Sequence, residues 1–309
     1  MVLLTGYFLL THLPIGFIYA KDVMTVRVQN KKDLDPIRRI FLRRCGAFFL
    51  AFASNLSFPS LCHAAWKLVV PIPKRPLLPN RSRSFRPKVA VVIDDIGNSV
   101  RLAREFLRIP VPLTFSILPL RPFSRQLMQE ITCSGHEVLL HQPMEPFRRD
   151  VDPGPGAVYT SFSAARIQDT ISSNLVQIHA AKGVNNHMGS KFTADREKIE
   201  EALEVIKQNG LFFIDSLTTP HSVAYKTAIG LRISAGQRNV FLDCHPGLEG
   251  TVREMKRLVA VARHWGKAIG IGHPFVSTLR GIKEFLSLHS RLCAQIEFVP
   301  VSRVVIDAK

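Results

Sequence analysis

The sequence predicts an α/β fold built from repeated strand–helix units, arranged either as an α/β barrel or as a doubly wound sheet. Short apolar runs rich in β-branched residues recur from Lys88 to the C-terminus, and stretches with helical periodicity separate them. Seven or eight such units fit into the about 220 residues that follow Lys88. Both architectures collect functional groups at the carboxyl ends of their strands.

The expected strands are continuous apolar runs rather than alternating ones. Such runs are typical of parallel strands that are covered on both faces, as in Lys88-Val-Ala-Val-Val-Ile-Asp94. In chain order, the expected strands cover residues 88–94, 113–118, 137–141, 183–185, 211–215, 240–243, 268–271 and 296–299.

Two of the intervening stretches have clear helical periodicity. Residues 194–208 place Ile199, Leu203 and Ile206 on one face with charges opposite, and Asn209-Gly210 provides a stop signal. Residues 251–265 repeat this pattern and end before Gly266, with an apolar face formed by Met255, Leu258, Val259 and Ala262. These helices are long enough to cover one side of a sheet.

The formal net charge of the 309-residue chain is +17, and its distribution argues against a nucleic-acid partner. Residues 1–64 carry 8 basic and 3 acidic residues, and residues 65–88 carry 7 basic and none acidic. The remaining residues carry 26 basic and 21 acidic residues, an excess of only +5. The excess charge therefore lies mainly in the N-terminal part, and we expect no nucleic-acid binding.

Residues 1–64 are predicted to be an N-terminal extension with a signal peptide. Basic residues at positions 38–44 precede an apolar run of about a dozen residues, and small residues near Ala64 suit signal-peptidase cleavage. Met24 is a plausible translation start, and a membrane anchor is the alternative interpretation. In either case the positive charge before the apolar run predicts that the main domain is exported, to the periplasm or the medium.

Residues 65–87 are rich in proline and arginine and are predicted to form a linker, with contact to an anionic envelope surface as the alternative interpretation. The main domain is then 88–309. Its three cysteines, Cys133, Cys244 and Cys293, have no CxxC spacing, so the sequence indicates neither a disulfide framework nor a cysteine zinc site.

Carboxylates, imidazoles and amides follow the expected strands, where a closed barrel would bring them to one mouth. Buried charged groups are costly unless they are paired or bind metal, so a shared polar site is favoured over coincidence. His245, beside Asp243, is the one other histidine that could belong to it. The set comprises Asp94, Asp95, His141, Asn185, Asn186, His187, Asp215, Asp243 and His273.

This set of residues suits metal-assisted hydrolysis. One carboxylate and two imidazoles make a three-ligand site with an open position, where a divalent cation lowers the pKa of water and polarises a carbonyl. A second carboxylate can take the proton of that water, and a distal histidine can protonate a leaving amine. The neighbouring Asp94 and Asp95 fit this division, because adjacent residues leaving a strand point in different directions. No P-loop, GxGxxG, GxSxG or HExxH pattern occurs.

The motifs of residues 88 to about 302 resemble the divergent polysaccharide deacetylase family. The resemblance implies a distorted (β/α) barrel of seven strands, export from the cytoplasm, an acetylated glycan substrate and a divalent metal, usually zinc. It rests on Val92-Ile-Asp-Asp-Ile-Gly97, Pro112-Leu-Thr-Phe-Ser-Ile-Leu-Pro119, Gly135-His-Glu-Val-Leu-Leu-His-Gln-Pro-Met-Glu-Pro146, Gly154-Pro-Gly156, Gly183-Val-Asn-Asn-His-Met-Gly-Ser190, Phe213-Ile-Asp-Ser216 and Gly272-His-Pro274.

By this resemblance, Asp94 is the expected general base and Asp95 a metal ligand. His141 matches the first histidine of the deacetylase HxxxH motif, but Glu145 stands at the second position. Either Glu145 or His187 supplies the remaining ligand, and His187 is preferred because imidazole suits zinc. His273 is the expected general acid.

Two alternatives remain for the supporting groups. Either Asp215 or Asp243 is expected to orient His273, and Asp215 is included among the catalytic residues. Glu145, Asp243 and Asn186 are alternative ligands or site residues.

Three function classes follow from these residues. The leading prediction is an exported, metal-dependent deacetylase of N- or O-acetyl groups on an envelope or extracellular glycan. The second is a weak or inert glycan-binding envelope protein that keeps the fold, which Glu145 in place of a histidine favours. The third is a glycoside hydrolase with a carboxylate pair such as Asp94 and Asp215.

Overall fold

The computed structural model describes residues 86–307 of the chain. The predicted signal peptide and its alternatives, the start at Met24 and residues 65–85 of the predicted linker lie outside the described residues. Among the helices of 86–307, none is long and apolar enough to cross a membrane.

The strands of the described region form one curled sheet in which each hydrogen-bonded pair of strands is parallel. Its order is β6-β5-β4-β3-β2-β1-β8-β7, and β9 pairs with the start of β1. The strands are β1 (Lys88–Ile96), β2 (Thr114–Ile117), β3 (Glu137–Met144), β4 (Gly183–Met188), β5 (Phe212–Asp215), β6 (Ala235–Gln237), β7 (Val240–Phe241), β8 (Lys267–Gly272) and β9 (Glu297–Phe298).

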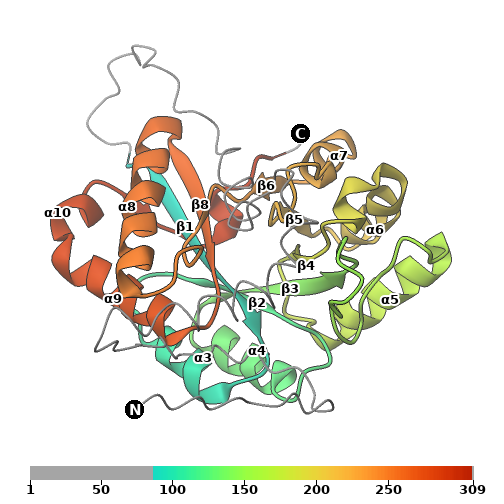
Figure 1. The fold of residues 1–309 in the computed structure, drawn as a ribbon, viewed down its shortest axis with the longest axis horizontal. Coiled ribbons are helices and arrows are strands. Elements are labelled where there is room, and N and C mark those ends of the chain that lie inside the picture. The colour runs from blue at the N-terminus through green and yellow to red at the C-terminus, as the bar shows by residue number, and fades with distance from the viewer. Residues whose placement is uncertain (1–85, 308–309) are drawn as a thin grey trace, which may run out of the picture. The chain divides into compact units, whose positions relative to one another are not determined.

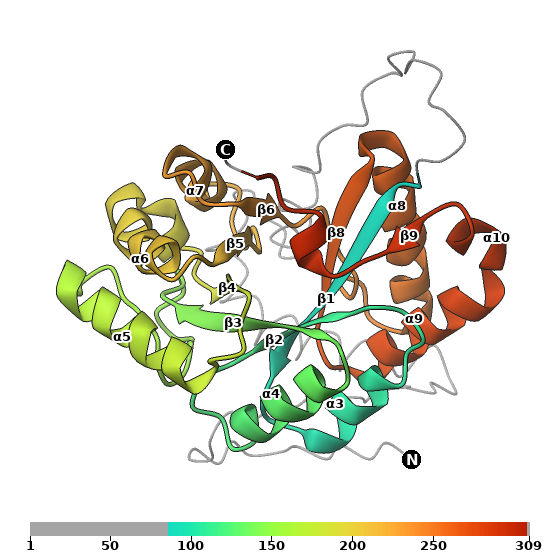
Figure 2. The ribbon, with the colours of Figure 1, turned by 180° about the vertical axis from the view of Figure 1, so that it is seen from behind.

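The two edges of the sheet, β6 and β7, are consecutive in the chain, so the sheet curls into an incompletely closed barrel (Figures 1 and 2). Only Arg238 and Asn239 separate these edges. The Arg238 amide donates to the Asp215 carbonyl of β5 at 3.0 Å, and the Asn239 amide donates to the Ile269 carbonyl of β8 at 2.9 Å. The short link therefore spans the gap between the two edges.

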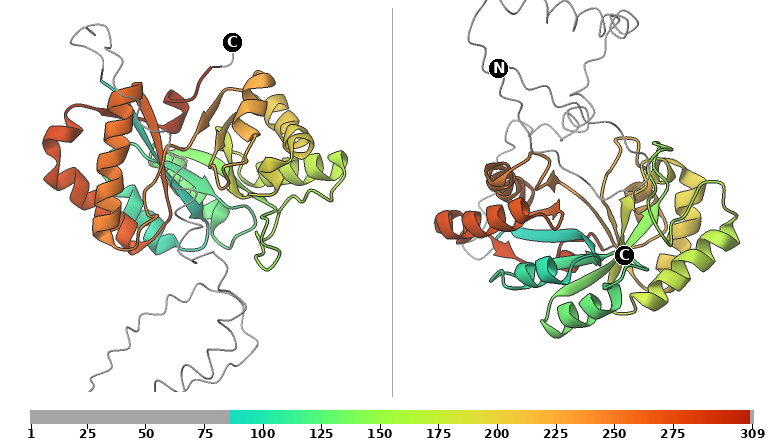
Figure 3. Two further views of the ribbon diagram at one scale, coloured as in Figure 1. Left: turned by 45° about the horizontal axis from the view of Figure 1, so that its top comes forward. Right: turned by 60° about the horizontal axis from the view of Figure 1, so that its bottom comes forward.

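The helices cover the outer side of this curled sheet, as Figure 3 shows from two further directions. Most of them connect one parallel strand to the next, as expected for strand–helix units. They are α3 (Val100–Leu107), α4 (Ser124–Cys133), α5 (Ala164–Gln177), α6 (Arg196–Gln208), α7 (Ala224–Gly230), α8 (Leu248–Trp265), α9 (Val276–Leu288) and α10 (Ser290–Cys293), with 3-10 turns η2 (Phe192–Ala194) and η3 (Val301–Arg303).

Two apolar layers result from the period-two alternation of side chains along the strands. On β1, Val89, Val91 and Ile93 pack with the helices, whereas Ala90 and Val92 belong to a smaller inner cluster. On β3, Leu139 faces the same inner cluster. These apolar residues fill the barrel interior at that level, and the next inward positions on β1 and β3, Asp94 and His141, are polar.

The structure confirms the predicted parallel α/β barrel architecture and both predicted helices. α6 begins at Arg196, because Asp195 caps its N-terminus by accepting from the Lys198 amide. α8 ends at Gly266, whose φ of 83° is the left-handed conformation that terminates many helices. The strand β6 was not predicted, because its sequence Ala-Gly-Gln contains no β-branched or aromatic residue.

Candidate active site

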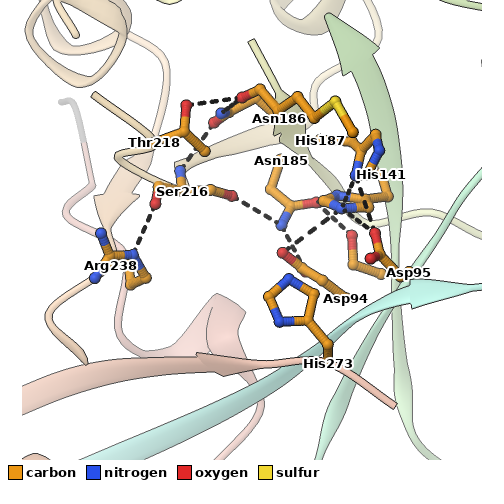
Figure 4. A network of polar contacts seen from close by, with 12 residues as sticks. Asp94, Asp95, His141, Asn185, Asn186, His187, Ser216, Thr218, Arg238 and His273 are labelled. Atoms are coloured by element: carbon orange, nitrogen blue, oxygen red, sulfur yellow. Dashed lines mark hydrogen bonds and ion pairs between the residues drawn. The ribbon is translucent and has the colours of Figure 1, made fainter. Parts of the chain in front are cut away.

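The site begins where the inner apolar rows of the strands end. Asp94 follows Ala90 and Val92 at the inward positions of β1, and His141 follows Leu139 on β3. His273 continues the inward row of β8. Because inward positions recur every second residue, these polar groups meet at the carboxyl ends of the strands (Figure 4).

Asp95 reaches the same site through a bulge in β1. The pairing of β1 with β2 changes register between Ile93 and Ile96, where one extra residue is accommodated on β1. Asp95 adopts a φ of 58°, which aspartate tolerates better than most residues. The bulge therefore redirects Asp95, so that two consecutive aspartates serve one site.

Three side-chain atoms, from β1, β3 and β4, converge on one point. Asp95 Oδ1 lies 2.9 Å from His187 Nδ1 and 3.2 Å from His141 Nε2. The two imidazole nitrogens lie 3.2 Å apart. Zinc bonds of 2.0–2.1 Å in a tetrahedral site separate two ligand atoms by about 3.3 Å. The spacing of these three atoms fits a divalent metal ion.

Hydrogen bonding around the three atoms supports this fit. Asp95 Oδ1 is buried and accepts no hydrogen bond of good geometry from any described residue. His141 Nδ1 lies 2.8 Å from Asn185 Oδ1, which can only accept, so Nδ1 carries the proton. The Nε2 lone pair of a neutral His141 then faces Asp95 and His187, as a metal ligand requires.

Asn185 on β4 connects His141 to Asp94. Its Oδ1 accepts from His141 and from the Ser116 hydroxyl, and its Nδ2 donates to Asp94 Oδ1 at 2.9 Å and to Ser216 Oγ at 3.2 Å. Asn185 is fully buried. One amide thus fixes the orientation of His141 and Asp94 together.

The electrostatics of the site favour a positive charge where the three atoms converge. Burial opposes ionisation of Asp95, but the imidazoles of His141 and His187 outweigh it and lower its pKa well below the usual value. Burial likewise opposes a charge on His141, yet Asp94 and Asp95 raise its pKa. Burial lowers the pKa of His187, and Asp95 offsets this only in part.

Asp94 is the one carboxylate of the pair with a raised pKa. Burial is the main cause, opposed by the nearby His141 and His273 and reinforced by Asp95. Asp94 Oδ2 lies 3.7 Å from His141 Nε2, farther than Asp95 Oδ1. A buried carboxylate of raised pKa beside the three converging atoms is suited to accept a proton.

His273 is held by Asp243 at the edge of the site. Its Nδ1 lies 3.1 Å from Asp243 Oδ1, and its backbone amide donates to Asp243 Oδ2 at 2.6 Å. Burial would lower the pKa of His273, but the hydrogen bond and charge of Asp243, with Asp95 and Asp94, raise it to about 9. His273 is therefore a protonated group next to Asp94 (Figure 4).

Comparison with known proteins places this fold and site in a family. Residues 91–305 match the sequence profile of the family described as divergent polysaccharide deacetylase. The chain belongs to the divergent polysaccharide deacetylase family. This match confirms the resemblance found in the motifs.

Three of the similar proteins are themselves uncharacterized. An uncharacterized protein of Haemophilus influenzae is 33% identical over 192 residues, 62% of this chain and 68% of that protein. The uncharacterized protein YibQ of Escherichia coli is 32% identical over 200 residues and is matched over only 62% of its own length. The crystal structure of an uncharacterized Agrobacterium tumefaciens protein has a TM-score of 0.68 at 26% identity, covering 73% of this chain and 92% of that one.

Asp215, predicted as a catalytic or orienting residue of this deacetylase-family chain, lies outside the cluster. It occupies an outward position of β5, like Phe213. Its Oδ1 accepts from the Leu217 amide at 2.8 Å, and its Oδ2 accepts from Ser222 Oγ at 2.8 Å and from the Tyr225 amide at 3.3 Å. Asp215 stabilises the loop before α7 and the first turn of α7, and of the two aspartates Asp243 is the one that contacts His273.

The two other alternative residues also serve the surrounding structure. Glu145 pairs with Lys191 Nζ at 2.7 Å and accepts two hydrogen bonds from Thr160, and the close group of ligand atoms does not include it. Asn186 faces the opposite side of β4 from Asn185, accepting from the Ser216 amide and donating to the Met188 carbonyl. Each of these side chains stabilises the conformation of a loop.

Sequence reasoning included Asn185 in the polar set without giving it a role, and it missed Ser116 and Arg238. Asn185 shares its inward face with His187, two positions on, so the strand period indicates that its side chain enters the site. Arg238 lies over the Phe241 ring at 3.5 Å, and that ring stacks on His273. It also donates to the Ser216 carbonyl at 2.7 Å. No local sequence pattern marks Arg238, because its role depends on the closure between β6 and β7.

Proposed function

We propose that this chain is an exported, metal-dependent deacetylase that hydrolyses acetyl groups on an envelope or extracellular polysaccharide, with zinc as its ion. The observation that carries the proposal is the convergence of Asp95 Oδ1, His141 Nε2 and His187 Nδ1 within 3.2 Å of one another. The family and its described substrate class support it. The basic N-terminal segment supports export.

In this proposal the residues of the chain divide the proton transfers between them. Asp95, His141 and His187 would hold a divalent ion, which would supply a Lewis acid to polarise the acetyl carbonyl and to activate water. Asp94 takes the proton of the attacking water. The hydrogen bond from Asn185 Nδ2 holds Asp94 in position. His273 gives its proton to the leaving amine or alcohol, so acetate and the free sugar group result.

The geometry weakens both competing functions. The inert glycan-binding alternative depended on Glu145 at a ligand position, whereas His187 brings an imidazole to that point. The glycosidase alternative needed Asp94 and Asp215 across one cleft, whereas Asp215 is fully buried on the outer side of β5.

The first prediction concerns turnover. We expect purified full-length protein to release acetate from N-acetylated chitooligosaccharides or from O-acetylated xylan, and a chelator to abolish this release until zinc is restored. A chain that binds the ion but releases no acetate from either substrate would contradict the proposed function. His141→Ala is the matched negative control, because it removes one of the three proposed metal ligands.

The second prediction concerns pH. His273 must be protonated to act as the acid, so activity is present below its pKa and is lost as pH rises through it; Asp243 contributes to raising that pKa. Asp243→Asn should therefore move the alkaline limb of the kcat profile to lower pH, by about 1 to 3 units. Asp215→Asn is the control, because that carboxylate does not contact His273. Equal shifts in both variants would refute the role of Asp243.

A further inference from the structure

A second group of side chains of the kinds that bind metals begins directly after Asp243 in the sequence. Cys244 and His245 belong to the loop between β7 and α8, and Glu254 lies in the second turn of α8. One sulfur, one nitrogen and one oxygen of these residues lie within 4.8 Å of one another. The sequence spacing from Cys244 to Glu254 matches no metal motif, so only the folded structure indicates that these residues could share an ion.

Glu254 gives this group its strongest feature, an unsatisfied buried oxygen. The Glu254 side chain is 1% exposed, and its Oε2 accepts from Arg257 Nη1 at 3.3 Å. Its Oε1 is buried and accepts no hydrogen bond from the described residues. A buried carboxylate oxygen without a hydrogen bond is costly, and such atoms are few in native proteins.

The same oxygen faces His245. Glu254 Oε1 lies 4.0 Å from His245 Nε2, which is longer than the separation of about 3.3 Å between two ligand atoms on one tetrahedral zinc ion. Arg253 Nε lies 3.5 Å away, but without hydrogen-bond geometry and on a side chain that is 59% exposed. A small inward movement of the His245 ring would bring both atoms within bonding distance of one ion.

The chemistry of the donors selects the kind of ion. Thiolate and imidazole favour zinc and similar borderline-soft ions, whereas calcium and magnesium prefer sites made of oxygen. A thiolate and a carboxylate together neutralise both charges of a divalent ion. Arg257 still donates to Glu254 Oε2 when Glu254 Oε1 binds the ion, so the charge of Arg257 remains compensated.

We propose that Cys244, His245 and Glu254 form a second metal site, selective for zinc-like divalent ions and separate from Asp95, His141 and His187. An ion there would tie the loop that carries Asp243 to α8. Because Asp243 holds His273, occupancy of this site would steady a group at the edge of the candidate active site. The proposal depends on its own ligands and does not need the chain to be a deacetylase.

Cobalt(II) titration of the reduced full-length protein tests this site separately. The Asp95 site contains no sulfur, so thiolate-to-cobalt charge-transfer absorption reports only a cysteine-containing site. We expect this absorption in the wild type, with an intensity that corresponds to one sulfur-bound cobalt per chain in addition to any cobalt held at the Asp95 site, and its loss in Cys244→Ser. Loss or marked weakening is also expected in His245→Ala and Glu254→Gln.

Two controls make the outcomes decisive. Cys133→Ser alters an exposed thiol on α4 and should keep the absorption, as should His141→Ala, which disables only the first site. Absence of the band in the wild type, or its survival in Cys244→Ser, would overturn the proposal. A band that needs Cys244 but is unchanged in both His245→Ala and Glu254→Gln would also overturn it. His245 is partly exposed, so its variant tests the site even if Glu254→Gln fails to fold.

Discussion

Asp94→Asn is expected to lower kcat for acetate release by about a thousandfold, within the range for loss of a general base. The amide keeps the size of the carboxylate and can still contact Asn185, but it cannot take a proton from water. Asp94 Oδ2 lies 3.7 Å from His141 Nε2 and is not one of the three converging atoms. Metal content should therefore stay unchanged, and steady-state kinetics with metal analysis measures both.

The matched control for this variant is Asp215→Asn. Asp215 is also a buried aspartate near the carboxyl end of a strand. The substitution removes hydrogen-bond acceptors that fasten α7, so it should lower the melting temperature and leave kcat of the folded protein within a few-fold of the wild type. An Asp94→Asn protein with wild-type kcat would show that another group is the base. A loss of metal in Asp94→Asn would show that Asp94 is itself a ligand.

Asn185→Ala is expected to weaken metal binding by about 10- to 100-fold, the usual effect of removing a residue that orients a ligand. The change leaves His141 Nδ1 and Asp94 Oδ1 without their partner. His141 is then free to change tautomer or to rotate, and Asp94 loses its orientation. Competition with a chelator measures the affinity, and kcat should fall as well because both groups are disturbed.

Asn174→Ala provides the comparison for this result. Asn174 is also buried, and its Nδ2, like that of Asn185, donates two hydrogen bonds, to Gln142 Oε1 and to the Gly156 carbonyl. It lies on α5 and is not one of the proposed ligands or their direct partners. The two variants should lose similar stability, yet only Asn185→Ala should lose metal affinity. Equal metal affinity in both variants would remove Asn185 from the site.

Much of the site could be predicted because strand periodicity and motif order are local properties of the sequence. The positions of Asp94, His141 and His273 follow from apolar runs that end in a polar residue at an inward position. The preference for His187 over Glu145 as a ligand follows from the chemistry of zinc, and the structure places His187 beside Asp95.

The remaining features depend on backbone geometry and on long-range closure. The bulge that redirects Asp95 has no signal in Val92-Ile-Asp-Asp-Ile-Gly97, because its position is set by pairing with β2. Asp215 lies outside the cluster although it ends a strand, because it has the same outward parity as Phe213. Asp243 reaches His273 only because β7 pairs with β8.

Metal analysis of the wild-type protein and of His141→Ala tests the central claim most directly. The convergence of Asp95, His141 and His187 predicts that the wild type retains one divalent ion per chain more than the variant, and that Asp95→Ala loses the same equivalent. Circular dichroism establishes that each variant is folded. Equal metal content in wild type and His141→Ala, or no divalent ion in either, would contradict the account.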